Sequence, residues 1–104
     1  MGQVDLSFVV PAYNEKALIE DTLGSLDEVV KNKMLPYELV VVDDGSKDAT
    51  LARIMRYASR NGHVKVVSYF KNMGKGYAVK TGFMQATGEV VVFANSDMES
   101  DLKR

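Results

Sequence analysis

Four short runs of continuous apolar residues limit what this chain can fold into. Within each run, valine, leucine and phenylalanine follow one another without the polar alternation of a sheet that has one face in water. Such strands are buried on both faces, as in a parallel sheet that carries helices on each side. We therefore expect strands at Leu6–Val10, Glu38–Val42, Val64–Tyr69 and Glu89–Phe93.

The segments between these runs have the spacing of helices. In the first segment, apolar residues recur every three or four positions and form one stripe, at Ile19, Leu23, Leu26 and Val30. Helices are predicted at about Glu15–Asn32, Asp48–Arg60 and Lys75–Thr87, with Asp48 as the N-cap of the second. The order βαβαβαβ, with connections long enough to hold a helix, predicts an α/β fold on a doubly wound parallel sheet.

The composition excludes several classes of protein. With 104 residues the chain is one domain or part of one. Its 13 basic and 14 acidic residues leave a net charge of −1, so bulk charge implies neither a nucleic-acid partner nor an anionic membrane surface. The absence of cysteine excludes disulfides and thiolate zinc sites. No run reaches the roughly 20 apolar residues of a membrane span, and we expect a soluble, cytoplasmic unit.

Ligands of such sheets bind beyond the carboxyl ends of the strands. The segments that follow the predicted strands are Pro11–Glu15, Asp43–Asp48, Phe70–Gly76 and Ala94–Asp101. Their polar residues are therefore the candidates for function, whereas His63 lies at the opposite edge and is expected on the surface.

The first two segments each allow two interpretations. We expect Pro11 to end the first strand sharply. Tyr13 and Glu15 offer an aromatic face and a carboxylate to a ligand, or else Asn14 and Glu15 only serve the start of the helix. The adjacent carboxylates of Asp43 and Asp44 either accept hydrogen bonds from a nucleobase or a ribose, or bond their own turn.

The last two segments also allow two interpretations, a ligand site or an ordinary connection. Lys75 lies between two glycines at the start of a helix, which suits a phosphate but equally a flexible turn. It belongs neither to a Walker A loop nor to a dinucleotide fingerprint. Oxygen donors at Asn95, Asp97 and Glu99 can converge on Mg²⁺ or Mn²⁺, or simply solvate a polar terminus.

Three blocks of the sequence, in their order and spacing, resemble those of a known protein family. Residues Phe8–Glu15 and Val41–Thr50 resemble the opening of family 2 glycosyltransferases of GT-A fold. The block Asn72–Gly82, with its Gly-Lys-Gly core, looks like dolichyl- or polyprenyl-phosphate glucosyl- and mannosyltransferases. The resemblance covers nearly the whole chain and implies the N-terminal, nucleotide-binding half of a GT-A fold.

Site residues follow from the resemblance by position. It implies that the nucleotide is bound by Pro11, Ala12, Tyr13, Glu15, Asp43, Asp44, Lys75, Ser96 and Asp97. It implies that the metal, Mg²⁺ or Mn²⁺, is held by Asp97 first, then Glu99, then Asn95. The metal block departs from the family pattern, because Asn95 stands where an aspartate is usual and Glu99 where an amide is common in this subgroup.

The activity implied is metal-assisted transfer of a sugar from a UDP- or GDP-linked donor to a polyprenyl or dolichyl phosphate or a similar acceptor. Residues 1–104 would be the donor-binding portion, truncated after the metal motif, peripheral at the cytoplasmic membrane face and inactive alone. The expected catalytic base lies beyond Arg104. The alternative is a non-catalytic α/β assembly module that forms a homo-oligomer through an exposed sheet edge.

Overall fold

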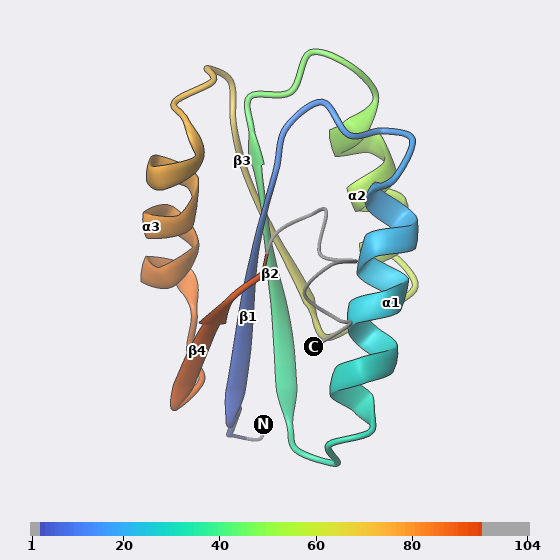
Figure 1. Cartoon of the computed structure of the whole chain (residues 1–104), viewed down its shortest axis with the longest axis vertical. Coiled ribbons are helices and arrows are strands. Elements are labelled where there is room, and N and C mark those ends of the chain that lie inside the picture. The colour runs from blue at the N-terminus through green and yellow to red at the C-terminus, as the bar shows by residue number, and fades with distance from the viewer. Residues whose placement is uncertain (1–2, 95–104) are drawn as a thin grey trace.

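A computed structural model describes residues 3–94 and contains a four-stranded parallel sheet (Figure 1). The elements are β1 (Leu6–Ala12), α1 (Ile19–Lys31), β2 (Tyr37–Asp44), α2 (Thr50–Ala58), β3 (Val64–Tyr69), α3 (Lys75–Gln85) and β4 (Val90–Phe93). The sheet order is β3-β2-β1-β4. The predicted α/β fold and the order βαβαβαβ are confirmed.

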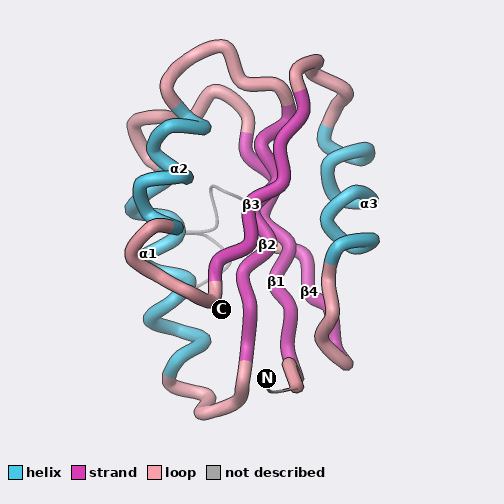
Figure 2. The backbone as a smooth tube through the Cα atoms, turned by 180° about the vertical axis from the view of Figure 1, so that it is seen from behind, coloured by secondary structure: helices cyan, strands magenta, loops and turns pink. Residues whose placement is uncertain are grey.

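Helices cover both faces of the sheet, which confirms the doubly wound prediction. Figure 2 shows α1 and α2 on one face and α3 alone on the other. Successive residues of a strand point to opposite faces. Val10 and Val41 accordingly belong to the core cluster with α1 and α2, whereas Val9 and Val40 pack with Ala78 of α3. The continuous apolar runs exist because both sets of side chains are buried.

Strand β1 continues through Pro11, so the expectation that this proline ends the strand was wrong. Pro11 pairs with Val42 of β2. The backbone N–H of Ala94 donates to the carbonyl of Val9, so Val9 and, two residues on, Pro11 direct their backbone groups toward β4. Proline has no backbone N–H to donate. Because β4 ends at Phe93, no residue of β4 stands where it would accept a hydrogen bond from position 11, so the proline costs the sheet no hydrogen bond.

Helix α1 begins four residues later than predicted, at Ile19. Asn14 has a φ of +49°, and its side-chain oxygen accepts from the backbone N–H of Lys47 instead of capping the helix. The predicted N-cap of α2 was also displaced, because Ala49 occupies that position. Asp48 nevertheless accepts from the backbone N–H of Thr50 at 2.9 Å, so it still serves the start of α2. Helix α3 ends at Gln85.

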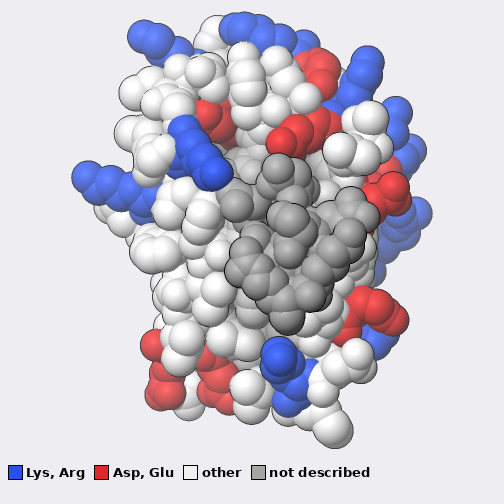
Figure 3. Space-filling model, in the orientation of Figure 1, with Lys and Arg blue, Asp and Glu red and all other residues white. Residues whose placement is uncertain are grey.

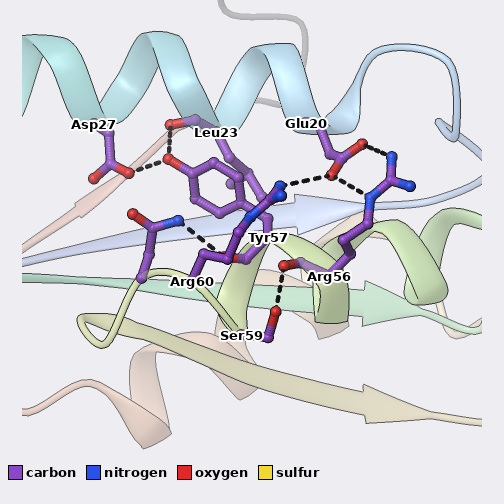
Figure 4. A network of polar contacts seen from close by, with 8 residues as sticks. Glu20, Leu23, Asp27, Arg56, Tyr57, Ser59 and Arg60 are labelled. Atoms are coloured by element: carbon purple, nitrogen blue, oxygen red, sulfur yellow. Dashed lines mark hydrogen bonds and ion pairs between the residues drawn. The ribbon is translucent and has the colours of Figure 1, made fainter.

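Polar contacts join α1 to α2 along their shared side (Figure 4). The guanidinium of Arg56 donates to both carboxylate oxygens of Glu20, at 3.0 and 2.6 Å. The hydroxyl of Tyr57 donates to the carboxylate of Asp27 and lies 3.4 Å from the carbonyl of Leu23. These contacts fix the two helices relative to each other over the same face of the sheet.

The side chain of His63 is 33% exposed, as expected for a residue at the surface, but His63 also belongs to a partly buried polar cluster. Its Nε2 lies 2.7 Å from Asp27 and 3.1 Å from the hydroxyl of Tyr37. Burial raises the pKa of Asp27, but hydrogen bonds from Tyr57, Tyr37 and His63 outweigh that effect and hold the pKa below its usual value. The cluster joins α1, α2 and the amino ends of β2 and β3.

None of the helices within residues 3–94 is long and apolar enough to cross a membrane.

Candidate functional site

The strand order reverses between β1 and β4, which defines where a ligand binds in such a sheet. From β1 the chain moves to β2 and then β3 on one side, and β4 returns to the other side of β1. In open parallel sheets the crevice at this reversal, beyond the carboxyl ends of the strands, is the usual ligand site. Ala12, Asp43 and Asp44 all lie at these carboxyl ends, with Ala12 paired to Asp43 and Asp44 paired to Tyr69.

Hydrogen bonds hold the segment after β1 against the segment after β2. The backbone N–H of Asn14 donates to Ser46 Oγ at 2.9 Å, and the N–H of Lys47 donates back to Asn14 Oδ1 at 2.8 Å. The N–H of Glu15 donates to Thr50 Oγ1 at 2.7 Å. Ser46 and Thr50 were not predicted to hold the segment after β1. Two hydroxyl side chains close to an acidic turn could have indicated this role.

Asp44 holds the segment after β3 in place. Its Oδ1 accepts from the Tyr69 hydroxyl at 2.7 Å and the Met73 N–H at 2.9 Å. Its Oδ2 accepts from Asn72 Nδ2 at 2.8 Å and the Gly74 N–H at 3.0 Å. Burial, followed by the bond to Asp44, raises the pKa of the Tyr69 hydroxyl well above its usual value. The buried carboxylate of Asp44 is therefore saturated by protein donors.

The turn after β2 packs directly on the same segment. Gly45 has a φ of +67°, which L side chains rarely adopt. A Cβ at this position would lie 2.4 Å from the backbone nitrogen of Asn72, so only glycine allows the approach. Together with Asp44, this contact fixes the backbone of the loop that leads into α3.

Asp43 is the neighbouring carboxylate, and its surroundings are different. Because strand residues alternate, Asp43 lies on the same face as Val41, toward α1 and α2, while Asp44 lies on the α3 face. Asp43 is only 2% exposed, and its Oδ1 has no hydrogen-bond partner among the described residues. A buried carboxylate oxygen without a donor is costly, so this atom is suited to accept from an N–H or O–H of a ligand.

Lys75 begins α3 and lies beside the end of β4. Its Nζ is 5.3 Å from the ring centroid of Phe93, the last residue of that strand, within the range of a cation–π contact. The ammonium is therefore held near the point where strand order reverses. Of the other predicted site residues, Pro11 and Ala12 are buried in β1 and Tyr13 is exposed on the following turn.

The predicted metal ligands lie outside the described residues. Asn95, Asp97 and Glu99, together with the predicted nucleotide residue Ser96, follow residue 94. Within residues 3–94 no group of three or more His, Cys, Asp or Glu side chains is arranged to hold a metal ion. The metal site therefore stays a prediction.

Known proteins share the sequence pattern and the fold of this chain. The model of the glycosyl transferase family 2 matches residues 7–103. A dolichyl-phosphate beta-glucosyltransferase of Trichomonas vaginalis is 38% identical over 100 residues, which cover 91% of this chain and 31% of that protein. The chain thus spans about a third of the length of this curated relative.

Solved structures of GT-A glycosyltransferases have the same fold. The mannosyltransferase PcManGT from Pyrobaculum calidifontis, in complex with GDP-Man and Mn²⁺, superposes with a TM-score of 0.76 at 32% identity. The match covers 92% of this chain and 28% of that one. TarS of S. aureus in complex with UDP-GlcNAc gives a TM-score of 0.76 at 36% identity, over 90% of this chain and 27% of that one. On the family match and these relatives, the chain belongs to the glycosyl transferase family 2.

Proposed function

We propose that this chain binds a nucleotide-diphospho-sugar at the carboxyl edge of its sheet and supplies the donor site of a glycosyltransferase. The observation that carries the proposal is the buried Asp43 oxygen that no described residue satisfies, at the edge where strand order reverses. The complexes of the two solved relatives, with GDP-Man and with UDP-GlcNAc, support the same class of ligand.

Different described residues are proposed to contact the base, the ribose and the diphosphate of the nucleotide sugar. Asp43 accepts a hydrogen bond from an N–H of the base, and Tyr13 and Glu15, with the backbone of Pro11 and Ala12, form the wall of the base and ribose pocket. Lys75 faces the diphosphate, where its ammonium pairs with the phosphate charge. Because its four hydrogen bonds go to the β3–α3 loop, Asp44 acts by positioning that loop.

The divalent cation is assigned to residues beyond the described range. We propose Asp97 as the first ligand, followed by Glu99 and Asn95, and Ser96 as a further contact of the nucleotide. Carboxylate and amide oxygens are the ligands that Mg²⁺ and Mn²⁺ prefer. When bound, such an ion neutralises the charge that develops on the departing nucleoside diphosphate. The Mn²⁺ in the PcManGT complex supports this assignment.

The acceptor side belongs to the complete enzyme. The relative named dolichyl-phosphate beta-glucosyltransferase supports a dolichyl or polyprenyl phosphate as acceptor. A site for that lipid, and any catalytic base, are proposed in the part of such an enzyme that this chain does not span. With a lipid acceptor, the enzyme works at the cytoplasmic face of a membrane.

Calorimetric titration with UDP and with GDP, each with and without Mn²⁺, tests the donor site. We expect metal-dependent binding of at least one nucleotide. The variant Asp43→Asn replaces an acceptor oxygen by a donor group and is expected to weaken binding about 10- to 100-fold, the equivalent of one charge-assisted hydrogen bond of about 1.5–3 kcal/mol. The matched control is Asp21→Asn on the exposed side of α1, which should bind as the unmodified chain does. No binding of either nucleotide under any condition would exclude the proposal.

A non-catalytic assembly role is the alternative. The edge strand β4 favours it, because Val90, Val92 and Phe93 are exposed there. Light scattering, measured together with the nucleotide titration, separates the assembly role from the donor site. A stable homo-oligomer without a nucleotide response supports the assembly module, whereas nucleotide binding supports the donor site.

A further inference from the structure

On the side of the molecule that α3 occupies, basic side chains lie among uncharged ones (Figure 3, left). Residues 70–88 contain three lysines (Lys71, Lys75 and Lys80) and no acidic residue, although the whole chain carries a net charge of −1. The average over the chain hides this local excess of positive charge. A segment of this kind attracts anionic surfaces within about one Debye length, roughly 8–10 Å at physiological salt.

Apolar side chains lie among these lysines and face outward. Phe70 is 92% exposed, Tyr77 47% and Met84 73%, and Met73 and Phe83 are exposed as well. Met73, Tyr77 and Met84 are spaced by four and seven residues, so they share one side of the helix and the turn that precedes it. Only Ala78 and Gly82 are buried in α3, so the helix presents small residues to the sheet and large ones to the outside.

Phe70 is exposed at the start of a loop that hydrogen bonds anchor to β2. Asp44 binds the backbone N–H groups of Met73 and Gly74 within this loop, and Gly45 packs against the backbone of Asn72. Since the loop is anchored, the exposure of Phe70 is a property of the fold. An aromatic ring held in water on a fixed loop is suited to insert into another phase or surface.

We propose that the outer face of α3 and the loop before it (Phe70, Lys71, Met73, Tyr77, Lys80 and Met84, the α3 face) dock onto a membrane that contains anionic lipids. Lysines that reach phosphate headgroups beside apolar side chains that enter the acyl boundary are the features of a peripheral membrane-binding surface. The α3 face is uncovered among the described residues, because α1 and α2 lie on the opposite side of the sheet (Figure 2).

The docking has a consequence for the donor site. The loop from residue 70 to residue 76 belongs both to the α3 face and to the carboxyl edge of the sheet, so a docked molecule holds its proposed nucleotide site next to the bilayer surface. This step rests on the proposed function, in which the acceptor is a lipid phosphate. The docking itself requires no nucleotide.

Co-sedimentation with vesicles tests the docking. The full chain is expected to bind vesicles of phosphatidylcholine mixed with phosphatidylserine, to bind phosphatidylcholine alone much more weakly, and to be released by added salt. Phe70→Ser is expected to lower the partition coefficient about tenfold, which is the effect of withdrawing one large apolar side chain. Lys71→Gln combined with Lys80→Gln should lower binding to the anionic vesicles only.

A matched control is available at the opposite end of the sheet. Met34 is 88% exposed on the α1–β2 connection and follows two lysines, Lys31 and Lys33. Met34→Ser should leave vesicle binding unchanged. A loss of binding in this variant, an unchanged partition of Phe70→Ser, or equal binding to both vesicle types would overturn the proposal. So would a change in molecular mass of Phe70→Ser without vesicles, because a second copy would then be the occupant.

Failure of the membrane docking can be distinguished from failure of the donor site. Phe70→Ser should unfold at the same urea concentration as the unmodified chain and bind nucleotide equally well, because its ring makes little contact with the protein. A chain that binds vesicles but no nucleotide would refute the donor site alone. A chain that binds nucleotide but no anionic vesicle would refute the docking alone.

Discussion

Asp43 and Asp44 are neighbours on β2, but their carboxylates have different hydrogen-bond partners. Asp44 is saturated by donors from the β3–α3 loop, whereas one oxygen of Asp43 has no donor within residues 3–94. Strand alternation explains the difference, because it directs the two side chains to opposite faces of the sheet. The pair could be predicted from the sequence as candidate ligands, but not which member is open, since this depends on contacts with residues 25 to 30 positions away.

The role of Asp44 in holding the loop can be measured by unfolding. Asp44→Asn keeps the shape of the side chain but turns an amide toward the N–H of Gly74, so one buried donor loses its acceptor. We expect the free energy of unfolding in urea to fall by about 2 kcal/mol. Asp21→Asn, at an exposed position, should change it by less than about 0.5 kcal/mol. Equal stability of the two variants would contradict the assigned role.

The Asp27 cluster predicts how stability depends on pH. The pKa of Asp27 is below its usual value of 3.8 in the folded state, so its ionised form stabilises the fold above that pH and the contribution is lost as pH falls through the lower folded value. The stability difference between the unmodified chain and Asp27→Asn should therefore be present at about pH 5 and shrink as the pH falls below about 3.8. Urea unfolding over this range measures it, and a difference that grows on acidification would refute the assignment.

At the scale of elements, the apolar pattern predicted every strand and helix within residues 3–94 but not all of their ends. The strands were found because burial on both faces leaves continuous apolar runs. Strand β1 extends through Pro11, and α1 starts at Ile19, because the turn between them bonds to the side chains of Ser46 and Thr50. The polar cluster at the opposite edge was missed. A signal was present, since Asp27 lies four residues after Leu23 and three before Val30, on the apolar side of its helix.

Two helix glycines give a matched test of how closely α3 packs on the sheet. A Cβ at Gly82 would lie 2.3 Å from the Cγ1 of the buried Val9, whereas nothing lies within 4 Å of a Cβ at Gly24 in α1. Gly82→Ala should therefore destabilise the fold by about 1–3 kcal/mol through overpacking. Gly24→Ala should stabilise it by about 0.5–1 kcal/mol, because alanine favours the helix.

Chemical denaturation of both glycine variants measures the difference. A stabilising effect of Gly82→Ala equal to that of Gly24→Ala would contradict the close contact between α3 and Val9.

At the scale of the whole molecule, the edge proposed to bind the nucleotide follows from topology. The sequence predicted alternating strands and helices, and the resemblance to family 2 glycosyltransferases predicted which loops hold the nucleotide. The order β3-β2-β1-β4 was not predictable from spacing, because spacing does not tell whether β4 adds to the free edge of β1 or to that of β3. The charge distribution was also hidden, since a net charge of −1 conceals the basic α3 face.

The central claim is that a nucleotide binds at the carboxyl edge of this sheet, beside Asp43. Amide-resolved NMR spectra recorded during titration with UDP and with GDP, in the presence of Mg²⁺, locate the binding site directly. We expect the largest changes in residues 11–15, 43–48 and 72–76. Changes centred on residues 32–36 and 61–63 at the opposite edge, or no changes with either nucleotide, would contradict it.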